Sequence, residues 1–463
     1  MSQKDFMLLR KTIRTNRLVY GLLKFPRLTA FLLTYLLGPR MIEKETPGNR
    51  DTRFGLARLG SGMATADELA SMRWYIIAMV EMMENLLKAH EKGEPIVCYD
   101  WSVPSEIIRA FHVETTSPVH FNRLSFNNNS DYAMEMIDKA DGEGLDYDMC
   151  NLNRVAMGAI LDRQMPPPTL YVSASHPCDS SRTSNQILHY LSDAEHYVLE
   201  APYHREKEDL DFYAKNLWDM IAFLEKHFNR PLDWEKLKKS VENINAFNKY
   251  LREVTVLHRA IPSPNLALYL QNTFSLHMTI PETDYAVNMA GKLLEIARER
   301  VARPTRKMKE KERVRVICWD PVPPAFDYYK WIEKHFGAIV VIDYEGSNFI
   351  PDIDTSSREA MIRGLGEYRL MTGMIRQTHG DATFITEELE QYIDEYSADC
   401  AIMNNTTGCR GNVAAKKLII DVCRRRGIPV LFLDVDIYDK RINSEAEMKT
   451  KIRDFFVSNG WGR

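Results

Sequence analysis

Three cysteines that lie far apart in the chain have the residue type and setting of ligands for a soft metal centre. Cys150 lies in DYDMCNLNR, Cys178 in SASHPCDSS and Cys409 in NNTTGCRGN. Each stands beside a predicted strand or helix start, so a fold can bring the three thiolates together. Three thiolates on a [4Fe–4S] cluster would leave one iron free for a substrate. This ligand set therefore favours a catalytic site over an electron carrier.

Two of the cysteines share one local pattern, which is a strand followed by a turn and a helix start. Cys178 follows the apolar run TLYVSAS (169–175), and Cys409 follows the run ADCAIMN (398–404). In open α/β sheets, ligands bind outside the carboxyl ends of the strands. The N–H groups at a helix start also lower the pKa of a nearby thiol, which suits a metal ligand.

Neighbouring residues fit the same site. Asp179 is a cap-type residue at the helix start after Cys178, and Cys150 heads the helix-like stretch NLNRVAMGAIL. In the third motif, Gly408 and Gly411 allow the backbone to approach a bulky inorganic cluster. We therefore expect Asp179 and Gly408 to lie in the surroundings of the cluster.

Each cysteine, taken alone, has a simpler interpretation as a small buried apolar residue. Cys98 is ambiguous, because it lies within a strand-like run but close to its carboxyl end. A nucleophilic pair of Cys178 with His176 or His204 is a further alternative, although no GxCxG-type turn supports it. Three cysteines inside apolar strands or helices fit the buried interpretation: Cys318, Cys400 and Cys423.

Two charged features have structural interpretations. Three acids at the end of a predicted strand, Asp434, Asp436 and Asp439, could bind a divalent cation, but capping of the following turn is the preferred interpretation. The charged stretch 297–316 contains Pro304, which breaks a helix, and is predicted to be a solvated linker. The alternative is that some of its Lys and Arg side chains bind phosphates of a cofactor such as coenzyme A.

The composition is that of an ordinary globular protein. The chain has 463 residues, of which 45% are hydrophobic and 27% charged, and this length predicts two or three domains. A net charge of −4 gives no general attraction to nucleic acid. Seven cysteines, an odd number, without a signal peptide argue against a disulfide framework and indicate a reducing cytoplasm.

The elements that must position the cysteines form two α/β units. We expect a helical N-terminal region (1–90), a first α/β domain (91–208), a helical middle section with the charged linker (209–312) and a second α/β domain (313–463). Short apolar strands alternate with helices in both units, and this alternation is typical of parallel sheets.

The most apolar segment, 18–37, is interrupted by Lys24, Pro26 and Arg27, so the remaining apolar run is too short to span a bilayer. It is predicted to form one or two amphipathic helices that cover the core or a partner subunit. The alternative is a helix that lies on a membrane surface.

Three stretches together resemble the 2-hydroxyacyl-CoA dehydratase and benzoyl-CoA reductase family of oxygen-sensitive iron–sulfur enzymes, in particular the D-component type of 2-hydroxyglutaryl-CoA dehydratase. DMCNLNRVAMGAILDRQMPPPTLYVSASHPCD resembles the paired-cysteine segment of the family. Residues 201–265 resemble its middle section with a P-x-P ending. Residues 396–456 are similar to the C-terminal segment that supplies the third cysteine.

The resemblance implies an α/β fold with two Rossmann-like (flavodoxin-like) parallel-sheet domains, in a heterodimer of two related subunits. It implies that Cys150, Cys178 and Cys409 bind a [4Fe–4S] cluster. A separate ATP-dependent iron–sulfur activator would inject one electron, and the substrate would be an acyl-CoA thioester. In the dehydratases of this family the thioester becomes a ketyl radical anion and loses its hydroxyl group, whereas the aryl reductases add electrons to the ring.

The sequence departs from the family pattern in two places. Many members carry a cysteine just before the V-P-x-E-I segment, but here Asp100 falls near that position. Members often carry a glutamate in the region where this chain has His120 and Asn122. Ser102 and His120 are therefore the candidate catalytic side chains.

The first hypothesis is thus a cluster-bearing dehydratase subunit. Its alternatives are an aryl-CoA reductase subunit, a non-catalytic iron–sulfur relay or partner subunit, and a metal-free α/β enzyme with buried thiols.

Overall fold

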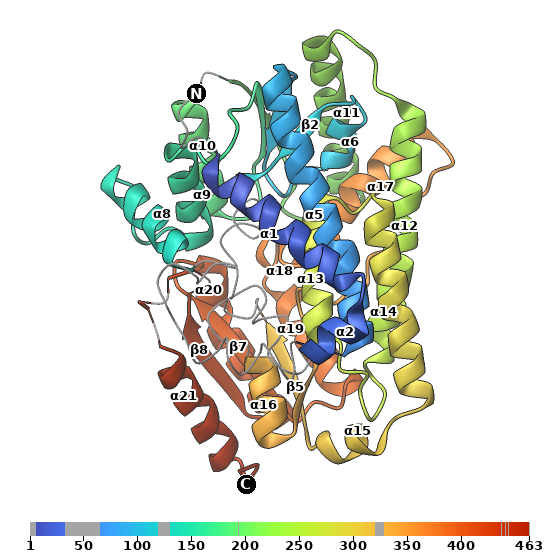
Figure 1. The fold of residues 1–463 in the computed structure, drawn as a ribbon, viewed down its shortest axis with the longest axis vertical. Helices are drawn as coiled ribbons and strands as arrows, with labels where there is room; N and C mark the ends of the chain where they lie inside the picture. Colours follow the sequence, from blue (N-terminus) through green and yellow to red (C-terminus); the bar gives the residue numbers. More distant parts are fainter. Residues whose placement is uncertain are drawn as a thin grey trace.

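Two four-stranded parallel sheets lie at opposite ends of this computed structural model (Figure 1). The structure describes residues 6–32, 65–118, 130–192, 194–319, 328–436, 438–439, 441–442 and 444–462. The first sheet has the order β2-β1-β3-β4 and consists of β1 (Ile96–Tyr99), β2 (Glu114–Thr116), β3 (Leu170–Ala174) and β4 (Glu195–Leu199). The second sheet has the order β6-β5-β7-β8 and consists of β5 (Val314–Trp319), β6 (Ala338–Asp343), β7 (Cys400–Thr406) and β8 (Val430–Val435).

The two sheets therefore repeat one strand order, in which the first strand of each lies between the second and the third. All neighbouring strands are parallel. This is the order of flavodoxin-like sheets, whose ligands bind where the first and third strands diverge. The predicted α/β fold class, with two Rossmann-like sheets and additional helical regions, is confirmed.

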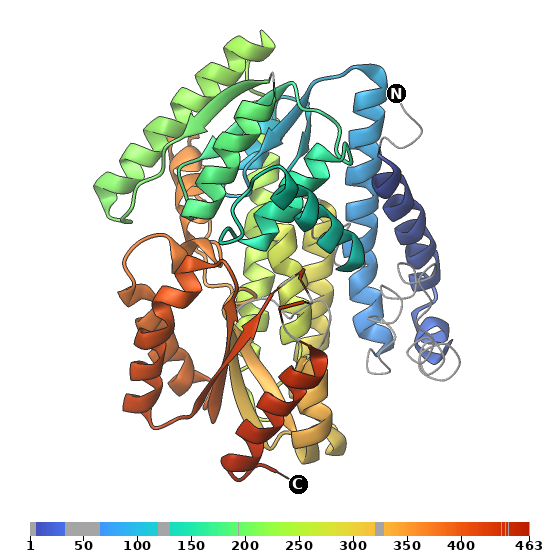
Figure 2. The same ribbon diagram turned by 90° about the vertical axis from the view of Figure 1, so that its left-hand side faces the viewer.

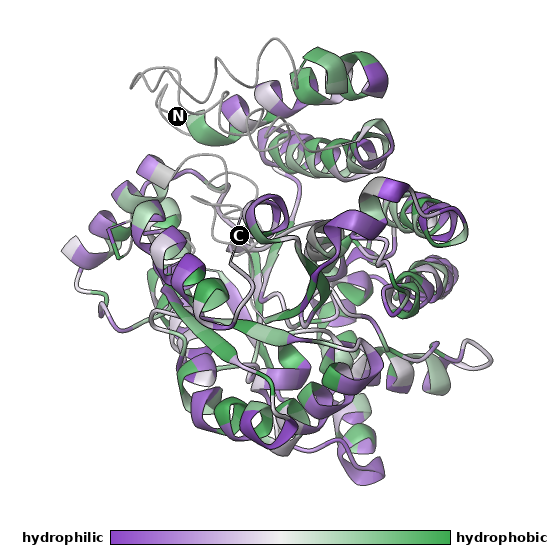
Figure 3. Cartoon of the chain, turned by 90° about the horizontal axis from the view of Figure 1, so that it is seen from below, coloured by the Kyte–Doolittle hydropathy of each residue, from purple (hydrophilic) through white to green (hydrophobic). Residues whose placement is uncertain are grey.

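Strands β1, β3, β5 and β6 are rich in β-branched and aromatic residues and are buried along their whole length. Such continuous apolar strands form where helices cover both faces of a parallel sheet. In Figure 3, hydrophobic residues line the strands and the inward sides of the surrounding helices. The sheets are thus fixed by burial on both faces, and their carboxyl ends are held in place for a site.

Helices surround the sheets and join them. The N-terminal helices and those of the first sheet region are α1 (Met7–Leu23), α2 (Pro26–Phe31), α5 (Ala66–Lys92), α6 (Ser105–Arg109), α8 (Ser130–Gly142), α9 (Asn151–Leu161) and α10 (Asp179–Leu191). The middle section forms α11 (Lys207–Phe228), α12 (Trp234–Leu257), α13 (Ala267–Thr279) and α14 (Asp284–Ala302). The C-terminal third of the chain forms α15 (Arg306–Lys311), α16 (Tyr328–Phe336), α17 (Arg358–Met371), α18 (Ile375–Thr378), α19 (Thr383–Glu395), α20 (Arg410–Arg426) and α21 (Glu445–Ser458). Of these, α17 packs in the core of the first sheet region.

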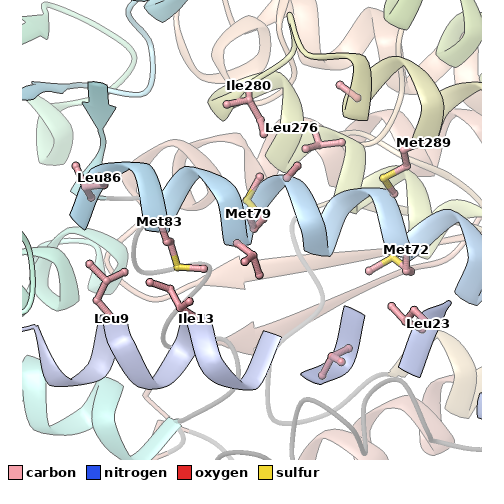
Figure 4. Close-up of a cluster of buried hydrophobic side chains, with 14 of the residues drawn as sticks. Leu9, Ile13, Leu23, Met72, Met79, Met83, Leu86, Leu276, Ile280 and Met289 are labelled. Carbon is pink, nitrogen blue, oxygen red and sulfur yellow. The ribbon is translucent and has the colours of Figure 1, made fainter. Parts of the chain in front are cut away.

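The helix α5 is the centre of a third apolar core, between the N-terminal helices and the middle section. It begins with a capping box, in which Thr65 accepts from the N–H of Glu68 and the Glu68 carboxylate accepts from the N–H of Thr65. Figure 4 shows its methionines between α1 on one side and α13 and α14 on the other. Figure 2 shows that α1 and α2 form the outermost layer on this side of the molecule.

The charged stretch 297–316 is more regular than predicted. The helix α14 continues to Ala302, and α15 forms after Pro304 with Thr305 as its cap. Lys311 also pairs with Glu333 of α16 at 2.8 Å. The stretch is therefore packed on the second sheet region and is not only a solvated linker.

A buried ion pair holds α17 in the core of the first sheet region. Arg369 of α17 donates to both carboxylate oxygens of Glu106 in α6, at 2.8 and 2.9 Å, and neither side chain is exposed. A bidentate contact of this kind fixes the relative orientation of the two side chains as well as the distance between them. Of the helices that the structure describes, none is long and apolar enough to cross a membrane.

Candidate metal centre

The three candidate cysteines occupy the same structural position. Cys150 is the N-cap of α9, Cys178 of α10 and Cys409 of α20. Cys178 follows β3 and Cys409 follows β7, which are the third strands of the two sheets. The predicted helix starts after Cys150, Cys178 and Cys409 are confirmed, and the third of these helices, α20, begins at Arg410. Each thiol therefore adjoins N–H groups that have no partner within the helix.

The loops that carry the cysteines contact one another. The Cys150 N–H donates to Ser180 Oγ at 3.1 Å, and Asn153 Nδ2 donates to the same oxygen at 2.8 Å. Ser180 lies two residues after Cys178, so these bonds tie the first two loops together. On the third loop, a Cβ added to Gly408 would stand 2.6 Å from the Met149 carbonyl oxygen. Gly408 thus permits close backbone contact between the Cys409 and Cys150 loops.

Arg410 connects all three loops. It directly follows Cys409, and its guanidinium lies 3.1 Å from the carboxylate of Asp148 and 4.0 Å from that of Asp179. These ion pairs are exposed, so each contributes at most about 1 kcal/mol. Their effect is positional, since one side chain reaches the residues that flank both other cysteines.

A side-chain hydrogen bond also joins the first sheet region to the second sheet region. Asn151, beside Cys150, donates through Nδ2 to Asp436 Oδ2 at 2.7 Å. The other oxygen of Asp436 accepts from the N–H groups of Tyr438 and Asp439, at 2.9 and 2.7 Å. The capping interpretation of the acids after β8 is confirmed for Asp436, which also anchors the Cys150 loop.

Asp100 holds the helix that begins after Cys178. It is buried, and its Oδ2 accepts from Ser181 Oγ at 2.9 Å and from Asn185 Nδ2 at 2.7 Å, both on α10. Its Oδ1 accepts from the N–H of Ser102 at 2.9 Å and contacts the Ser102 hydroxyl. Burial raises the pKa of Asp100, and these donors oppose the rise. Asp100 therefore holds the turn after β1 and the start of α10 together.

Ser102 is fully buried in this network. Its hydroxyl lies within hydrogen-bond distance of Asp100 and, at 3.0 Å, of the His176 carbonyl oxygen. It therefore links the loop after β1 to the turn that carries Cys178. The other candidate catalytic residue, His120, lies outside the described residues, as does Asn122.

The thiols are in a setting where ionisation is unfavourable without a cation. Burial raises the pKa of Cys150 well above its usual range, and the nearby Cys409 and Cys178 raise it further. Cys178 is exposed, yet its sulfur is largely surrounded by protein atoms, and this desolvation raises its pKa to about 11. The N–H groups of Ser181 and Ser180 lower that pKa but do not prevail. The helix start therefore lowers the pKa of Cys178 as expected, but burial outweighs this effect.

This arrangement fits a multinuclear soft-metal group better than a single ion. Within the described residues, no three His, Cys, Asp or Glu side chains are close enough together to hold one metal ion. In a [4Fe–4S] cluster each thiolate binds a different iron, so the ligands stand further apart than around one ion. Cys409 and Cys178 lie near enough to Cys150 to raise its pKa, so the three share one region, and a bound cationic group would favour their thiolate forms.

The other cysteines lie in the core. Cys318 and Cys400 are strand residues, Cys423 lies in α20, and each is at most 1% exposed, so their predicted burial is confirmed. Cys98, the ambiguous one, is buried in β1 beside Tyr171 and Met157. Burial raises the pKa of each of these thiols, as expected for inert structural cysteines.

His176, which precedes the turn of Cys178, is also buried, and neither ring nitrogen has a hydrogen-bond partner among the described residues. Its ring lies 5.2 Å from that of His379 and 6.0 Å from that of Tyr213. Burial and the neighbouring His379 lower the pKa of His176 well below its usual value, so the imidazole is neutral. His204, the alternative partner of Cys178, is exposed.

Comparison with known proteins gives two matches. The model of the family described as "2-hydroxyglutaryl-CoA dehydratase, D-component" matches residues 100–457, a range that includes all three candidate cysteines. The chain is also 23% identical, over 399 residues, to one of the subunits of the benzoyl-CoA reductase of Thauera aromatica. That alignment covers 81% of this chain and 90% of the relative.

Proposed function

The chain belongs to the 2-hydroxyglutaryl-CoA dehydratase, D-component family, and from this membership we propose that it is the cluster-bearing subunit of a 2-hydroxyacyl-CoA dehydratase. The observation that carries the proposal is the convergence of three cysteine-bearing helix starts at the junction of the two sheet regions. Cys150, Cys178 and Cys409 would bind a [4Fe–4S] cluster. When bound, this group supplies the one-electron reduction by which a thioester becomes a ketyl radical anion and loses its 2-hydroxyl group.

The protein residues have three tasks in this proposal. The three thiolates hold the cofactor, with no fourth cysteine in the described parts of the loops that meet there. Asp100 and Ser102 fix the turn and the helix start at Cys178, so Ser102 is a positioning residue rather than one that touches substrate. Arg410 and the Asn151–Asp436 bond hold the loops in register across the two sheet regions.

The small pocket beside this network does not serve as the acyl-CoA site. It is lined in part by Asp100, Trp101, Ser117 and Tyr171, and it has room for about one water molecule. We propose that the thioester binds at the outer side of the three loops, where Cys178 is exposed. His120 remains a candidate for contact with the substrate.

The proposed partners follow from the family. They are a second, related subunit in a heterodimer, and an ATP-dependent iron–sulfur activator that delivers the electron. None of the seven cysteines, all of which lie in described parts of the chain, forms a disulfide bond, which suits a reducing compartment such as the cytoplasm.

The second candidate function is that of an aryl-CoA reductase subunit. It is favoured by the similarity to the benzoyl-CoA reductase of Thauera aromatica, which extends over 90% of that relative. The third is a relay subunit without a substrate site, since the glutamate often found near position 120 in the family is absent.

The test is an anaerobic assay of the complex with its partner subunit and activator. We expect dehydration of a 2-hydroxyacyl-CoA and no dearomatisation of benzoyl-CoA, and the reverse result would assign the reductase. Cys178→Ser should reduce the rate by more than about 100-fold, because a lost ligand costs more than a lost neighbour of a ligand. Cys423→Ser, at a buried thiol of α20, is the matched control. A relay would show no change in its electron paramagnetic resonance spectrum when acyl-CoA is added.

A further inference from the structure

The outer side of the two N-terminal helices combines cations with bulky apolar side chains. Residues 6–32 contain six Lys and Arg and no Asp or Glu, although the whole chain has a net charge of −4. The inner side of α1 is accounted for, because Leu9 and Ile13 are buried against α5 (Figure 4). The exposed side chains of these helices therefore lie on the opposite, outer side.

Four large apolar residues are exposed on this outer side. Leu18 is 57% exposed, Phe25 65%, Leu28 56% and Phe31 53%. Phe25 is the N-cap of α2 and precedes Pro26, so the chain turns there and presents the ring at a corner. A cluster of exposed phenylalanine and leucine on a folded domain marks an interaction site.

The cations on this side fall into two groups. Arg10 and Arg17 pair with Glu91 and Glu84 of α5, and so neutralise acids on the neighbouring helix. In the described part of the chain, Arg14 and Arg27 have no acidic partner, and both are exposed. Lys24 lies 5.1 Å from the centre of the Tyr20 ring. Positive charge therefore remains uncompensated next to the exposed apolar residues.

We propose that this face binds an anionic lipid surface. The helices α1 and α2 would lie along the membrane, with Phe25, Leu28 and Phe31 in the headgroup region and the arginines at the phosphates. Lys and Arg interleaved with Phe and Leu on one helical face is the pattern of interfacial membrane helices. Residues 6–32 carry charge of one sign only, with no Asp or Glu, and this positive charge suits an anionic lipid surface.

The shape of the molecule permits this contact. In Figures 2 and 3, α1 and α2 lie at the edge of the fold, outside α5 and away from both sheets. A flat surface can therefore meet them without contact with the loops that carry the three cysteines. Since no described helix spans a bilayer, the association would be peripheral and reversible.

The experiment is co-sedimentation of the complete chain with vesicles of phosphatidylcholine, alone or mixed with phosphatidylglycerol at about 30%, in about 0.15 M and about 0.5 M salt. We expect binding only to the anionic vesicles, and weaker binding at high salt because the charges are then screened. Arg14→Glu with Arg27→Glu should reduce the partition coefficient by roughly fivefold per cation removed. Leu28→Ser with Phe31→Ser should also reduce it.

Matched controls separate this face from a general charge effect. Lys238→Glu with Lys239→Glu makes the same change in net charge on exposed positions of α12 and should leave binding unchanged. Val457→Ser removes an equally exposed apolar side chain from α21 and should do the same. Circular dichroism checks that each variant is folded.

Three results would overturn the proposal. The first is no binding of the wild-type chain to anionic vesicles, and the second is an equal loss of binding in the Lys238 and Lys239 variant. The third is loss of the partner subunit, without loss of vesicle binding, in the Arg14 and Arg27 variant.

Discussion

At the scale of single residues, a buried carboxylate organises the surroundings of Cys178. Asp100 accepts bonds from Ser102, Ser181 and Asn185, which lie on two different segments of the first sheet region. The amide of Asn185 is in turn oriented by the Tyr171 hydroxyl, which donates to its oxygen at 2.6 Å. Hydrogen bonds to a charged acceptor stabilise the fold more than bonds to a neutral acceptor, because each of them is charge-assisted.

Asp100→Asn therefore tests the network. The amide has one acceptor oxygen in place of two, so two buried donors lose their partner, at roughly 1.5–3 kcal/mol each. We expect the free energy of unfolding in urea to fall by about 3 kcal/mol or more. The Cys178 thiol should also react faster with a thiol reagent in the metal-free protein, while Cys423 should not. Unchanged stability together with unchanged reactivity of Cys178 would contradict this role.

The local setting was enough to predict that Cys150, Cys178 and Cys409 lie at helix starts, because strand–turn–helix junctions are visible in sequence. The residue pairs that hold the three cysteine loops together were not predictable. Arg410 and Asp148 are separated by 262 positions, and Asn151 and Asp436 by 285. Contacts of this range leave no local pattern, so neither pair had a signal in a single sequence.

At the scale of elements, the candidate site depends on how closely the starts of α9, α10 and α20 approach. A close backbone approach occurs at Gly408, with φ +74, where Met149 faces the α-carbon. A side chain at this position meets two problems at once, which are the left-handed backbone and the carbonyl at 2.6 Å.

Gly408→Ala and Gly427→Ala separate these two effects. Gly427 ends α20 with φ +71 and has no atom within 4 Å of an added Cβ. Both variants should lose roughly 1 kcal/mol of stability from the backbone conformation. Gly408→Ala should lose more, and it alone should lose iron, because the Cys409 loop must move away from Cys150. Measurements of thermal unfolding and of bound iron check this, and equal behaviour of the two variants would refute it.

Most strands were predictable from the sequence because they are short, apolar and fully buried. The predicted runs at 169–175 and 398–404 correspond to β3 and β7. The strands β2 and β4 were missed. β2 has three residues, and β4 (EHYVL) is largely solvent-facing, so neither shows a continuous apolar run.

At the scale of the whole molecule, buried neutral histidines tie the elements together. His258 Nδ1 lies 3.0 Å from the Val341 carbonyl oxygen, and His277 lies 3.0 Å from both the Tyr368 hydroxyl and the Asn348 amide. Burial lowers the pKa of His258 to about 4 and that of His277 to about 3. These groups make the stability of the fold depend on pH.

The sign of this dependence follows from proton uptake. Below about pH 6.5 the unfolded chain binds a proton at each of the two histidines and the folded chain does not, so stability falls as pH falls. Between about pH 7.5 and about pH 5.5 the two together should cost about 3 kcal/mol of unfolding free energy. His277→Gln should remove about half of this loss of unfolding free energy between the two pH values, and so make its dependence on pH less steep. The exposed His204→Gln is the control, and a slope that His277→Gln leaves intact would contradict the assignment.

The two-sheet architecture was predictable from the alternation of strands and helices, since that pattern repeats within each half. The packing of α17 in the first sheet region was not, because it rests on pairs such as Arg369 with Glu106, separated by 263 positions. Burial of a charged pair runs against the average behaviour of Arg and Glu, so composition alone gives no sign of it.

The most direct measurement is iron and acid-labile sulfide in the chain purified without oxygen. We predict about four irons and about four sulfides per chain. Cys150→Ser, Cys178→Ser and Cys409→Ser should each abolish this content, while Cys423→Ser retains it. A wild-type chain without iron, or one that keeps its full iron content after loss of any of the three thiols, would contradict the account.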